Sequence, residues 1–575
     1  MSKYSQAGRV IAIKTPLGQD ALLLESLRGR ESISEPFHFE IELLAEIKTD
    51  VRFDRIIGQL VTIEIHRRPE EKRYLNALVK SFSETGRDHE FTSFRAELVP
   101  SLWLLSKRVQ SRVFQDLSVP EILQKVLKPF QVKYDLSATY HPREYCVQYR
   151  ESDFNFASRL MENEGIFYYF EHSDGAHTMV VSDSAKKHPT ISGASGNIDF
   201  DNSPSGANTS MVRVLTWTKT QELRSGSYSM RDHFFEIPDQ HFEAKEKATK
   251  DVQVGQVTHH PNVAGNEDLE IYDYPGGYAT RFDGIDRSGG AASSRLRLIF
   301  EEKERLVRVR MEEQDAASLE IRGSGNCTHF SAGHKFTLQK HFSGNGSYLL
   351  KSVSHQLETS YRSTDQGGAA EYKNEFTCIP LALLFRPARR TEVPVIASFQ
   401  TATVTGPAGE QIFCDRYGRV KVQFHWDRQG KNDGDSSCWL RVSQIWAGGR
   451  WGAFFWPRIG HEVVVGFEEG DPDRPLIVGS VYNNKNMPPF QLPLRKKWSG
   501  IKSETVEGLA KQNFNAIVFV DDDDHEHLAL YSERHMAINA EYDTRFKQGR
   551  NKAERVPGAR VSTTGRLPGT DNGNG

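Results

Sequence analysis

Between residues 400 and 493, short runs of alternating apolar and polar residues are separated by closely spaced turns. In one run, apolar Val420, Val422, Phe424 and Trp426 alternate with Lys421, Gln423 and His425, which predicts a strand with one buried and one solvated face. Glycine, proline and aspartate at 417–418, 448–449, 457–460 and 470–473 mark the points where strands should end. About five strands fit this stretch, which predicts a small closed β-barrel of the oligonucleotide/oligosaccharide-binding (OB) type over residues 400–492. That fold alone specifies no function.

The first 385 residues are also rich in strand candidates. Apolar alternation between turns predicts two β-barrel units in this region. The expected strands are 9–13, 21–27, 37–43, 60–65, 212–218, 296–300, 306–311, 335–339, 348–355 and 374–379.

A helical insertion at about residues 100–175 interrupts the first of these units. Ser118 is a candidate N-cap for a short amphipathic helix over 118–127. A second helix is expected to begin at Ser152 and to stop at Gly165. The aromatic run 166–170 that follows is interpreted as a buried strand, because nothing beside it supports a ligand-stacking platform.

The C-terminal part of the chain is a narrow β stub. Residues 386–399 are expected to be an extended linker into the barrel, and 493–555 to begin a β-prism needle. Apolar residues alternate along 536–543, and 516–520 are apolar on both faces. Such a ribbon has too little area to form its own core, so it should need copies of itself. The tail 556–575, rich in Gly, Thr, Pro and Asn, is expected to be flexible.

Composition excludes several classes of function. A chain of 575 residues should contain three or four domains. Lysine and arginine total 73 against 76 aspartates and glutamates, which argues against nucleic-acid binding. The five cysteines lie far apart without metal-site spacing, which favours a reducing compartment and assembly in the cytoplasm. We see no Sec signal and no apolar run long enough to span a bilayer.

Catalytic motifs are missing from the sequence, so we expect a protein that is not an enzyme and has no cofactor. The strongest chemical candidate is the run 521–527, in which Asp523, His525 and His527 are weak candidates for metal ligands. A solvated hairpin turn explains the same residues, and we prefer that interpretation.

Several strings resemble one family closely. They are residues 415–422 (DRYGRVKV), 436–442 (SSCWLRV), 457–463 (PRIGHEV) and 470–475 (GDPDRP), and they are similar to the barrel domain of the VgrG spike proteins of type VI secretion systems. Residues 31–37, 148–172 and 271–276 resemble the hub region of the same family, which is related to contractile phage baseplate hubs.

The resemblance implies a homotrimeric spike and hub that caps the inner tube and punctures the target envelope mechanically. It also implies contacts with inner-tube and baseplate proteins, a tip protein and effector cargo, and delivery to the target cell by the secretion apparatus itself. In the family, apolar residues of the needle meet on a threefold axis. We therefore expect the trimer interface to include Val518, Val520, Met536, Ile538, Ala540 and Tyr542.

Two other hypotheses stay open at this point. In the first, the cluster at 521–527 binds a metal ion and serves a hydrolase. In the second, the OB barrel binds a glycan or an oligonucleotide. We rank the second last, because Phe424 and Trp426 better fit the barrel core or subunit contacts.

Overall fold

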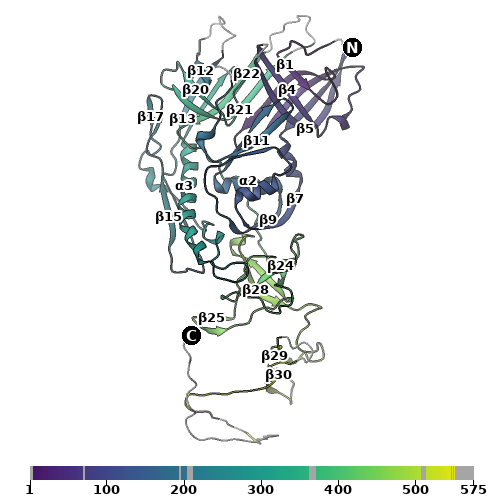
Figure 1. Ribbon diagram of the computed structural model, residues 1–575, viewed down its shortest axis with the longest axis vertical. Coiled ribbons are helices and arrows are strands. Elements are labelled where there is room, and N and C mark those ends of the chain that lie inside the picture. Colours follow the sequence, from purple (N-terminus) through teal and green to yellow (C-terminus); the bar gives the residue numbers. More distant parts are fainter. Residues whose placement is uncertain are drawn as a thin grey trace. The chain divides into compact units, whose positions relative to one another are not determined.

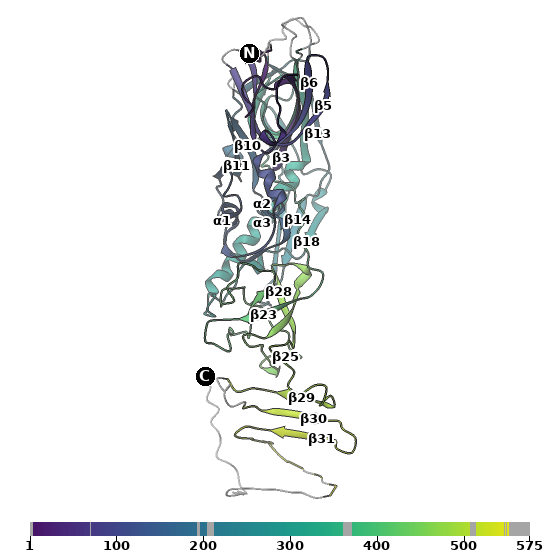
Figure 2. The same cartoon turned by 90° about the vertical axis from the view of Figure 1, so that its right-hand side faces the viewer.

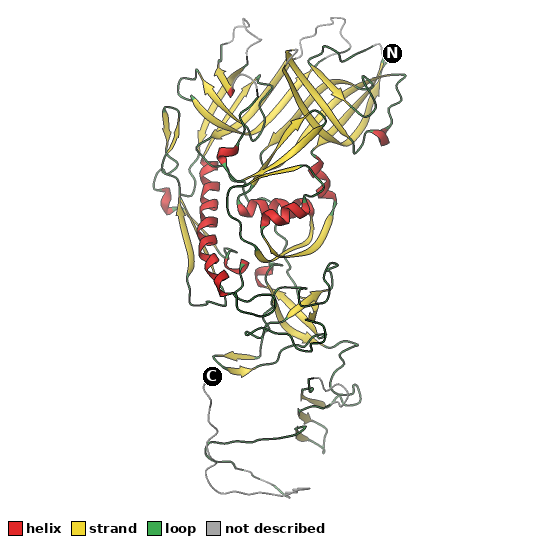
Figure 3. Cartoon of the chain, in the orientation of Figure 1, coloured by secondary structure: helices red, strands yellow, loops and turns green. Residues whose placement is uncertain are grey.

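The computed structural model describes residues 4–68, 71–192, 196–203, 212–359, 361, 371–506, 513–545, 547 and 549–550, with the backbone only for 67, 68, 71 and 371. The chain forms two compact units, Met1–Asn486 and Met487–Gly575, and each is described by itself. The first unit consists mainly of strands and loops with a few helices, and the described part of the second unit contains three short strands joined by loops (Figures 1 and 3). Within the described residues, every helix is too short or too polar to cross a bilayer. The predicted tail 556–575 lies outside the described residues.

A twelve-stranded sheet dominates the first unit. Its strands follow the order β1-β4-β5-β6-β3-β2-β21-β20-β12-β13-β19-β22. The predicted strands at 9–13, 21–27, 37–43 and 60–65 correspond to β1–β4. The bounds are β1 (Ile11–Lys14), β2 (Leu23–Ser32), β3 (Glu35–Glu46), β4 (Leu60–Arg68), β5 (Glu71–Arg87), β6 (Phe91–Val99), β12 (Asn197–Phe200), β13 (Arg213–Gln221), β19 (Leu319–Gly325), β20 (Lys335–Gln339), β21 (Gly346–Glu358) and β22 (Glu371–Pro380).

The second half of this sheet closes on itself. An additional pairing between β21 and β22 completes a six-stranded barrel. The first half joins that barrel through the antiparallel pairing of β2 with β21, and its strands β3, β5 and β6 curve strongly (Figure 2). One closed barrel of the two that we predicted is therefore confirmed, and the other six strands continue the same sheet.

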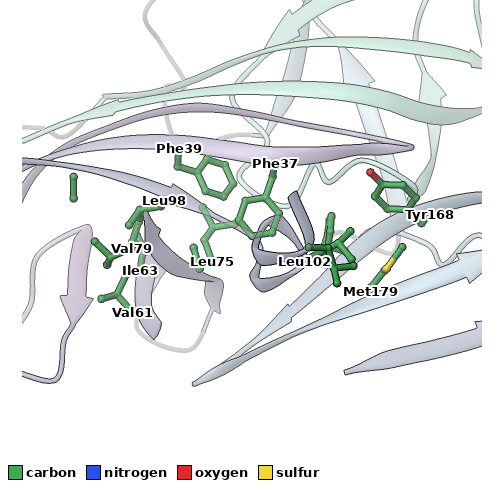
Figure 4. Close-up of a cluster of buried hydrophobic side chains, with 14 of the residues drawn as sticks. Phe37, Phe39, Val61, Ile63, Leu75, Val79, Leu98, Leu102, Tyr168 and Met179 are labelled. Carbon is green, nitrogen blue, oxygen red and sulfur yellow. The ribbon is translucent and has the colours of Figure 1, made fainter. Parts of the chain in front are cut away.

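The insertion predicted at about 100–175 continues to the end of β11 at Ser182, and it packs on the first six strands. Phe37, Ile63 and Leu75 of the sheet share one buried cluster with Leu102 and Met179 of the insertion (Figure 4). Because this core is continuous, the insertion is a layer of the first unit. Its elements are β7 (Val109–Leu117), α1 (Val119–Val126), β8 (Val132–Asp135), β9 (Arg143–Ser152), α2 (Asp153–Glu164), β10 (Phe167–Ser173) and β11 (Ala176–Ser182).

Both predicted helices are confirmed, and their ends have the expected caps. The Ser152 hydroxyl accepts a hydrogen bond from the Asn155 backbone N–H, and Gly165 ends α2 with φ 72°. At the start of α1, the Glu121 carboxylate accepts hydrogen bonds from the Ser118 N–H and hydroxyl. The aromatic run is the buried strand β10.

A long helix replaces two of the strands that we predicted. The strands predicted at 296–300 and 306–311 fall instead on a 3₁₀ turn, Ser293–Arg297, and on α3 (Leu298–Ser318), which follows it. The helix packs against β14 (Ser227–Asp232) and β15 (Phe242–Lys247), and β18 (Glu270–Asp273) pairs with β14 in the same sheet. The short hairpin of β16 (Val252–Val254) and β17 (Val257–His259) completes this part of the unit. Ile299, Leu306 and Val307 of α3 are buried in a cluster with Met230 and Phe242. The two strand predictions were wrong.

The small barrel is formed by β23 (Gln400–Thr405), β24 (Lys421–Phe424), β27 (Glu462–Phe467) and β28 (Pro475–Val481), in the order β24-β23-β27-β28. Bridges of Leu440 to Val420 and of Val442 to Ile477 close the ring. The predicted wet face is wrong at Lys421 and Gln423, since all four residues of β24 are buried, whereas His425 just after the strand is exposed as predicted. The Lys421 Nζ lies 4.8 Å from the centroid of the Trp439 ring, and the Gln423 amide bonds to the following loop.

The second unit contains one antiparallel sheet, in the order β29-β30-β31. The strands are β29 (Trp498–Lys502), β30 (Ala516–Val520) and β31 (His527–Tyr531). The structure describes 532–545 without helix or strand, so the alternation along 536–543 has no strand partner within the described part of this chain.

Candidate functional site

The first candidate site is the junction where the N-terminal region meets the small barrel. Tyr145 and Val147 of β9 are buried in the same apolar cluster as Val420, Val422 and Ile477 of the barrel. The core of the barrel is therefore completed by side chains from the N-terminal region, and moving the barrel would expose apolar surface to water.

Arg419 ties the two parts together by charge. Its buried guanidinium lies 2.6 Å (Nε) from Asp415 Oδ2 in the barrel and 2.9 Å (Nη1) from Asp283 Oδ2 in the N-terminal region. Nη2 also donates a hydrogen bond to Asp283 Oδ1 at 3.0 Å. Burial lowers the pKa of Arg419, but these carboxylates outweigh burial and the pKa is raised. The guanidinium thus donates one charge-assisted hydrogen bond to each carboxylate, and such bonds are short and strong, so Arg419 ties the barrel to the N-terminal region.

Further hydrogen bonds surround this pair. The Val147 N–H donates to Asp473 Oδ1 at 2.6 Å, and the Trp439 Nε1–H donates to the Asp286 carbonyl at 2.8 Å. Burial, with the nearby Asp471 charge, raises the pKa of Asp473 to about 7. Because these contacts act at separate points, the junction resists both rotation and sliding.

The second candidate site is an exposed aromatic hairpin on the barrel. Strands β25 (Trp446–Gly448) and β26 (Trp451–Ala453) pair across a tight turn, and the two Trp rings meet edge to face with centroids 4.9 Å apart. Gln444 anchors the hairpin by two hydrogen bonds to the Phe455 backbone. The exposed apolar side chains of this segment are Ile445, Trp446, Trp451, Phe454, Phe455 and Trp456.

The third candidate site is one face of the sheet in the second unit. Cross-strand pairs Ile501–Ile517, Ile517–Leu530 and Phe519–Leu528 place apolar side chains on one side of the sheet. All of them are exposed, whereas Val518 and Val520 alternate to the other side and are half-buried and buried. Met536, Ile538, Ala540 and Tyr542, the other predicted interface residues, are exposed. The expectation that these six residues form a trimer interface remains a prediction.

The acidic run 521–527 connects β30 to β31 as an exposed turn. Asp524 takes the left-handed conformation with φ 63°, and Lys497 Nζ lies 2.5 Å from Asp522 Oδ1. The Nδ1 atoms of His525 and His527 hydrogen-bond to backbone carbonyls of the turn. Asp523 therefore has no converging histidine ligands here. Among the described residues, no three Asp, Glu, His or Cys side chains gather in a geometry suited to a metal ion.

The aromatic residues that a ligand-binding barrel would offer are engaged within the fold. Phe424 is buried, and the half-buried Trp426 stacks on it with centroids 5.3 Å apart. The Trp426 indole N–H donates to Gln400 Oε1 at 2.9 Å. This arrangement supports a core role for both residues.

The sequence analysis missed most of the junction. Asp415 and Arg419 lie in a string noted for its resemblance, but Glu144, Glu236 and Asp283 come from three distant segments. No local spacing connects these carboxyl groups, so a single sequence carries no signal that would bring them together.

Comparison with known families agrees with this architecture. The model of the phage tail baseplate hub (GPD) family matches residues 30–361, and that of the type VI secretion system/phage-baseplate injector OB domain matches residues 413–482. The second match confirms that the small barrel is an OB domain.

The chain is similar to curated spike proteins over most of its length. It is 33% identical over 558 residues to the type VI secretion system spike protein VgrG1b of Pseudomonas aeruginosa, covering 96% of this chain and 71% of that protein. For VgrG1a of the same organism the values are 34% over 550 residues, 95% and 80%. The actin cross-linking toxin VgrG1 of Vibrio cholerae is 32% identical over 536 residues, but the match covers only 45% of that longer protein.

Two solved structures share the fold. One is an E. coli component of the type VI secretion system described as structurally similar to T4 bacteriophage tail proteins gp27 and gp5, with TM-score 0.54, 18% identity and coverage of 82% of this chain and 100% of that chain. The other is a Francisella PdpA–VgrG complex, with TM-score 0.54, 9% identity and coverage of 91% and 88%. Together with the sequence matches, they show that this chain belongs to the VgrG family of type VI secretion system spike proteins.

Proposed function

We propose that three copies of this chain assemble into the structural hub and spike of a type VI secretion apparatus. The observation that carries the proposal is the uncovered apolar face of the second unit, made by Ile501, Ile517, Phe519, Leu528 and Leu530. A three-stranded sheet with one such face exposed is at the lower limit of independent stability in water. Copies of the same sheet are complementary partners for it, and their association would start the β-prism needle.

The aromatic hairpin of the OB domain supports the same proposal. Its six exposed apolar side chains lie within twelve residues, a concentration that marks interaction surfaces in soluble proteins. Aromatic residues are also enriched at the centres of protein interfaces. We assign the hairpin, with the sheet face, to contacts between the three copies.

The junction between the N-terminal region, which we call the hub, and the OB domain supports a mechanical role. An axial load on the spike would pass through Arg419, Asp473 and the shared apolar cluster into the hub. Many buried contacts of this kind keep local unfolding rare, so the spike would puncture the target envelope without bending at this point. We propose no reaction and no cofactor for this chain.

Partners follow from the same assignment. We propose that the hub caps the inner tube and contacts baseplate proteins, and that the needle carries a tip protein or effector cargo. The PdpA complex of the Francisella relative is a precedent for partners of this kind. Assembly would take place in the cytoplasm, and the apparatus would then deliver the spike to the target cell.

Analytical ultracentrifugation of the purified protein tests the proposal. We expect a trimer at micromolar concentration, and a shift toward monomer in the variant Phe519→Asp/Leu528→Asp, because charges on the apolar face would be desolvated by assembly. The control is Glu526→Gln in the exposed turn of the same hairpin, which should leave the trimer intact. A wild-type protein that stays monomeric, or a double variant that assembles like wild type, contradicts the proposal.

A further inference from the structure

A pocket opens on the surface of the hub where the insertion packs on the first sheet. Its volume is about 210 Å³, and its wall is mainly apolar and includes Leu102 and Met179, both drawn in Figure 4. Leu60 and Gln131 also line the pocket and are exposed, so it is open to solvent. An apolar cavity of about 150 Å³ in another protein binds benzene, so this pocket has room for one aromatic or large aliphatic side chain.

The wall of the pocket is fixed by the fold itself. The Met179 N–H donates to the Gln131 carbonyl at 3.0 Å, which ties β11 to the segment before β8. The Ser101 N–H donates to His177 Nε2 at 2.9 Å, and the other ring nitrogen of His177 bonds to Asn76 Oδ1 at 2.7 Å. A pocket that is formed before its ligand arrives avoids the ordering cost that weakens binding to mobile surfaces.

The wall also offers polar groups to a ligand. Within the described residues, the Gln131 side-chain amide and the Ser101 hydroxyl form no hydrogen bond, although both residues line the pocket. An amide both donates and accepts, and a hydroxyl does the same. Apolar pockets with a few such groups are typical binding sites, and these groups suit the backbone of a peptide.

The charges beside the pocket that lack a counter-ion are positive. Lys128 precedes Pro129 of the wall, and Lys107 ends the 3₁₀ helix Ser101–Lys107, whose first residues belong to the wall. Both lysines are exposed, and neither forms an ion pair in the part of the chain that the structure describes. The Lys107 Nζ lies 4.6 Å from the centroid of the Trp103 ring, a contact that leaves its charge available.

The acidic residues nearest in sequence to the wall do not cancel this charge. Asp174, in the turn between β10 and β11, has its Oδ2 2.7 Å from the Lys14 Nζ. Glu171 follows Phe170 of the wall, but successive side chains of a strand point to opposite faces. Phe170 and Tyr169 accordingly belong to different core clusters, and Glu171 lies on the face of Tyr169, away from the pocket.

We propose that this pocket docks an acidic segment of a protein partner: one bulky apolar side chain of the segment enters the pocket, and aspartates or glutamates beside it pair with Lys107 and Lys128. A buried apolar anchor supplies most of the affinity in such contacts, and charges at the rim supply specificity. The pocket belongs to a single chain, so the proposal stands or falls separately from trimer formation.

Fluorescence polarisation with the full chain and a labelled peptide tests the proposal. The probe is a short fluorescein-labelled peptide with a central tryptophan flanked by aspartates. We expect saturable binding with a Kd no weaker than about 100 μM. Alanine in place of the tryptophan, or lysines in place of the aspartates, should each weaken binding at least about tenfold.

Variants of the chain locate the binding site. Leu60→Glu adds a negative charge to the wall and should weaken the acidic peptide at least about tenfold. Because Leu60 is 43% exposed, this variant should keep its fold, which circular dichroism checks. Lys107→Glu/Lys128→Glu should weaken the acidic peptide and strengthen the lysine peptide.

The matched control is Lys219→Glu/Lys250→Glu, which changes the net charge equally at exposed positions elsewhere on the hub and should bind like wild type. A wild-type chain that does not bind the acidic peptide overturns the proposal. So does binding that Leu60→Glu and Lys107→Glu/Lys128→Glu leave unchanged. Equal weakening in the control also overturns it, since binding would then follow net charge alone.

Discussion

At the scale of single residues, the buried histidines of the hub make its stability sensitive to acid. His177 donates through Nδ1 to Asn76 Oδ1 at 2.7 Å and accepts through Nε2 from the Ser101 N–H at 2.9 Å. Both ring nitrogens of the neutral form are thus satisfied, and a second proton on Nε2 would oppose the Ser101 N–H. Burial lowers the pKa of His177 to about 4.

The sign of the resulting pH effect is defined. Between pH 6.5 and about 4 the unfolded chain binds the proton and the folded chain does not, so the free energy of unfolding falls as the pH falls. We expect a loss of about 1.4 kcal/mol per unit of pKa difference for His177. Urea denaturation across this range should show a shallower pH slope for His177→Gln, while the exposed His425→Gln keeps the wild-type slope. An unchanged slope in His177→Gln would refute this account.

At the scale of elements, local signals predicted only part of the fold. The helices α1 and α2 were predictable because their caps, Ser118, Ser152 and Gly165, lie next to the segments that they delimit. In α3, three charged residues are buried, and two of them, Glu302 and Arg310, interrupt the apolar stripe of the helix. Their charges hide the helical period, and the alternation of Val307, Val309 and Met311 suggests a strand instead.

Partners that hold these charges come from distant parts of the chain. Glu302 pairs with Arg281 at 2.5 Å, and Arg310 donates to the Asn163 carbonyl at 2.8 Å. The same explanation applies to Lys421 and Gln423, whose burial depends on Trp439 and on the loop after β24. The candidate site was likewise predictable only in part. The sequence indicates its strands and turns, but it does not show which remote carboxyl groups contact Arg419.

The aromatic hairpin β25–β26 gives a prediction for one element. We expect Trp446→Ser/Trp451→Ser to change the free energy of unfolding of the monomer by no more than about 0.5 kcal/mol, because both side chains are exposed. The same variant should weaken assembly, as measured by sedimentation. By contrast, Trp439→Ala removes a buried ring and should cost about 3–5 kcal/mol. A hairpin variant that assembles as tightly as wild type would show that this surface is not part of the interface.

At the scale of the whole molecule, the two compact units make separable contributions. Among the described residues, the five buried apolar clusters consist entirely of residues of the first unit. The first unit therefore contains its own core, whereas the sheet of the second unit leaves Phe519 and Leu528 exposed. The buried core that stabilises the fold lies in the first unit, and the second unit adds an apolar face for assembly.

A chain ending at Asn486 separates these contributions. We expect it to fold with the exchange protection of the hub and OB domain unchanged, because every core cluster is retained. Its trimer should dissociate at a concentration at least about tenfold higher than that of the full chain, since the dissociation constant of a trimer scales as concentration squared and about 2.8 kcal/mol of lost apolar contact per trimer suffices for that change. Sedimentation over a concentration series measures the difference. If both chains dissociate at the same concentration, the sheet face of the second unit contributes nothing to assembly, and the hub and the aromatic hairpin alone hold the three copies together.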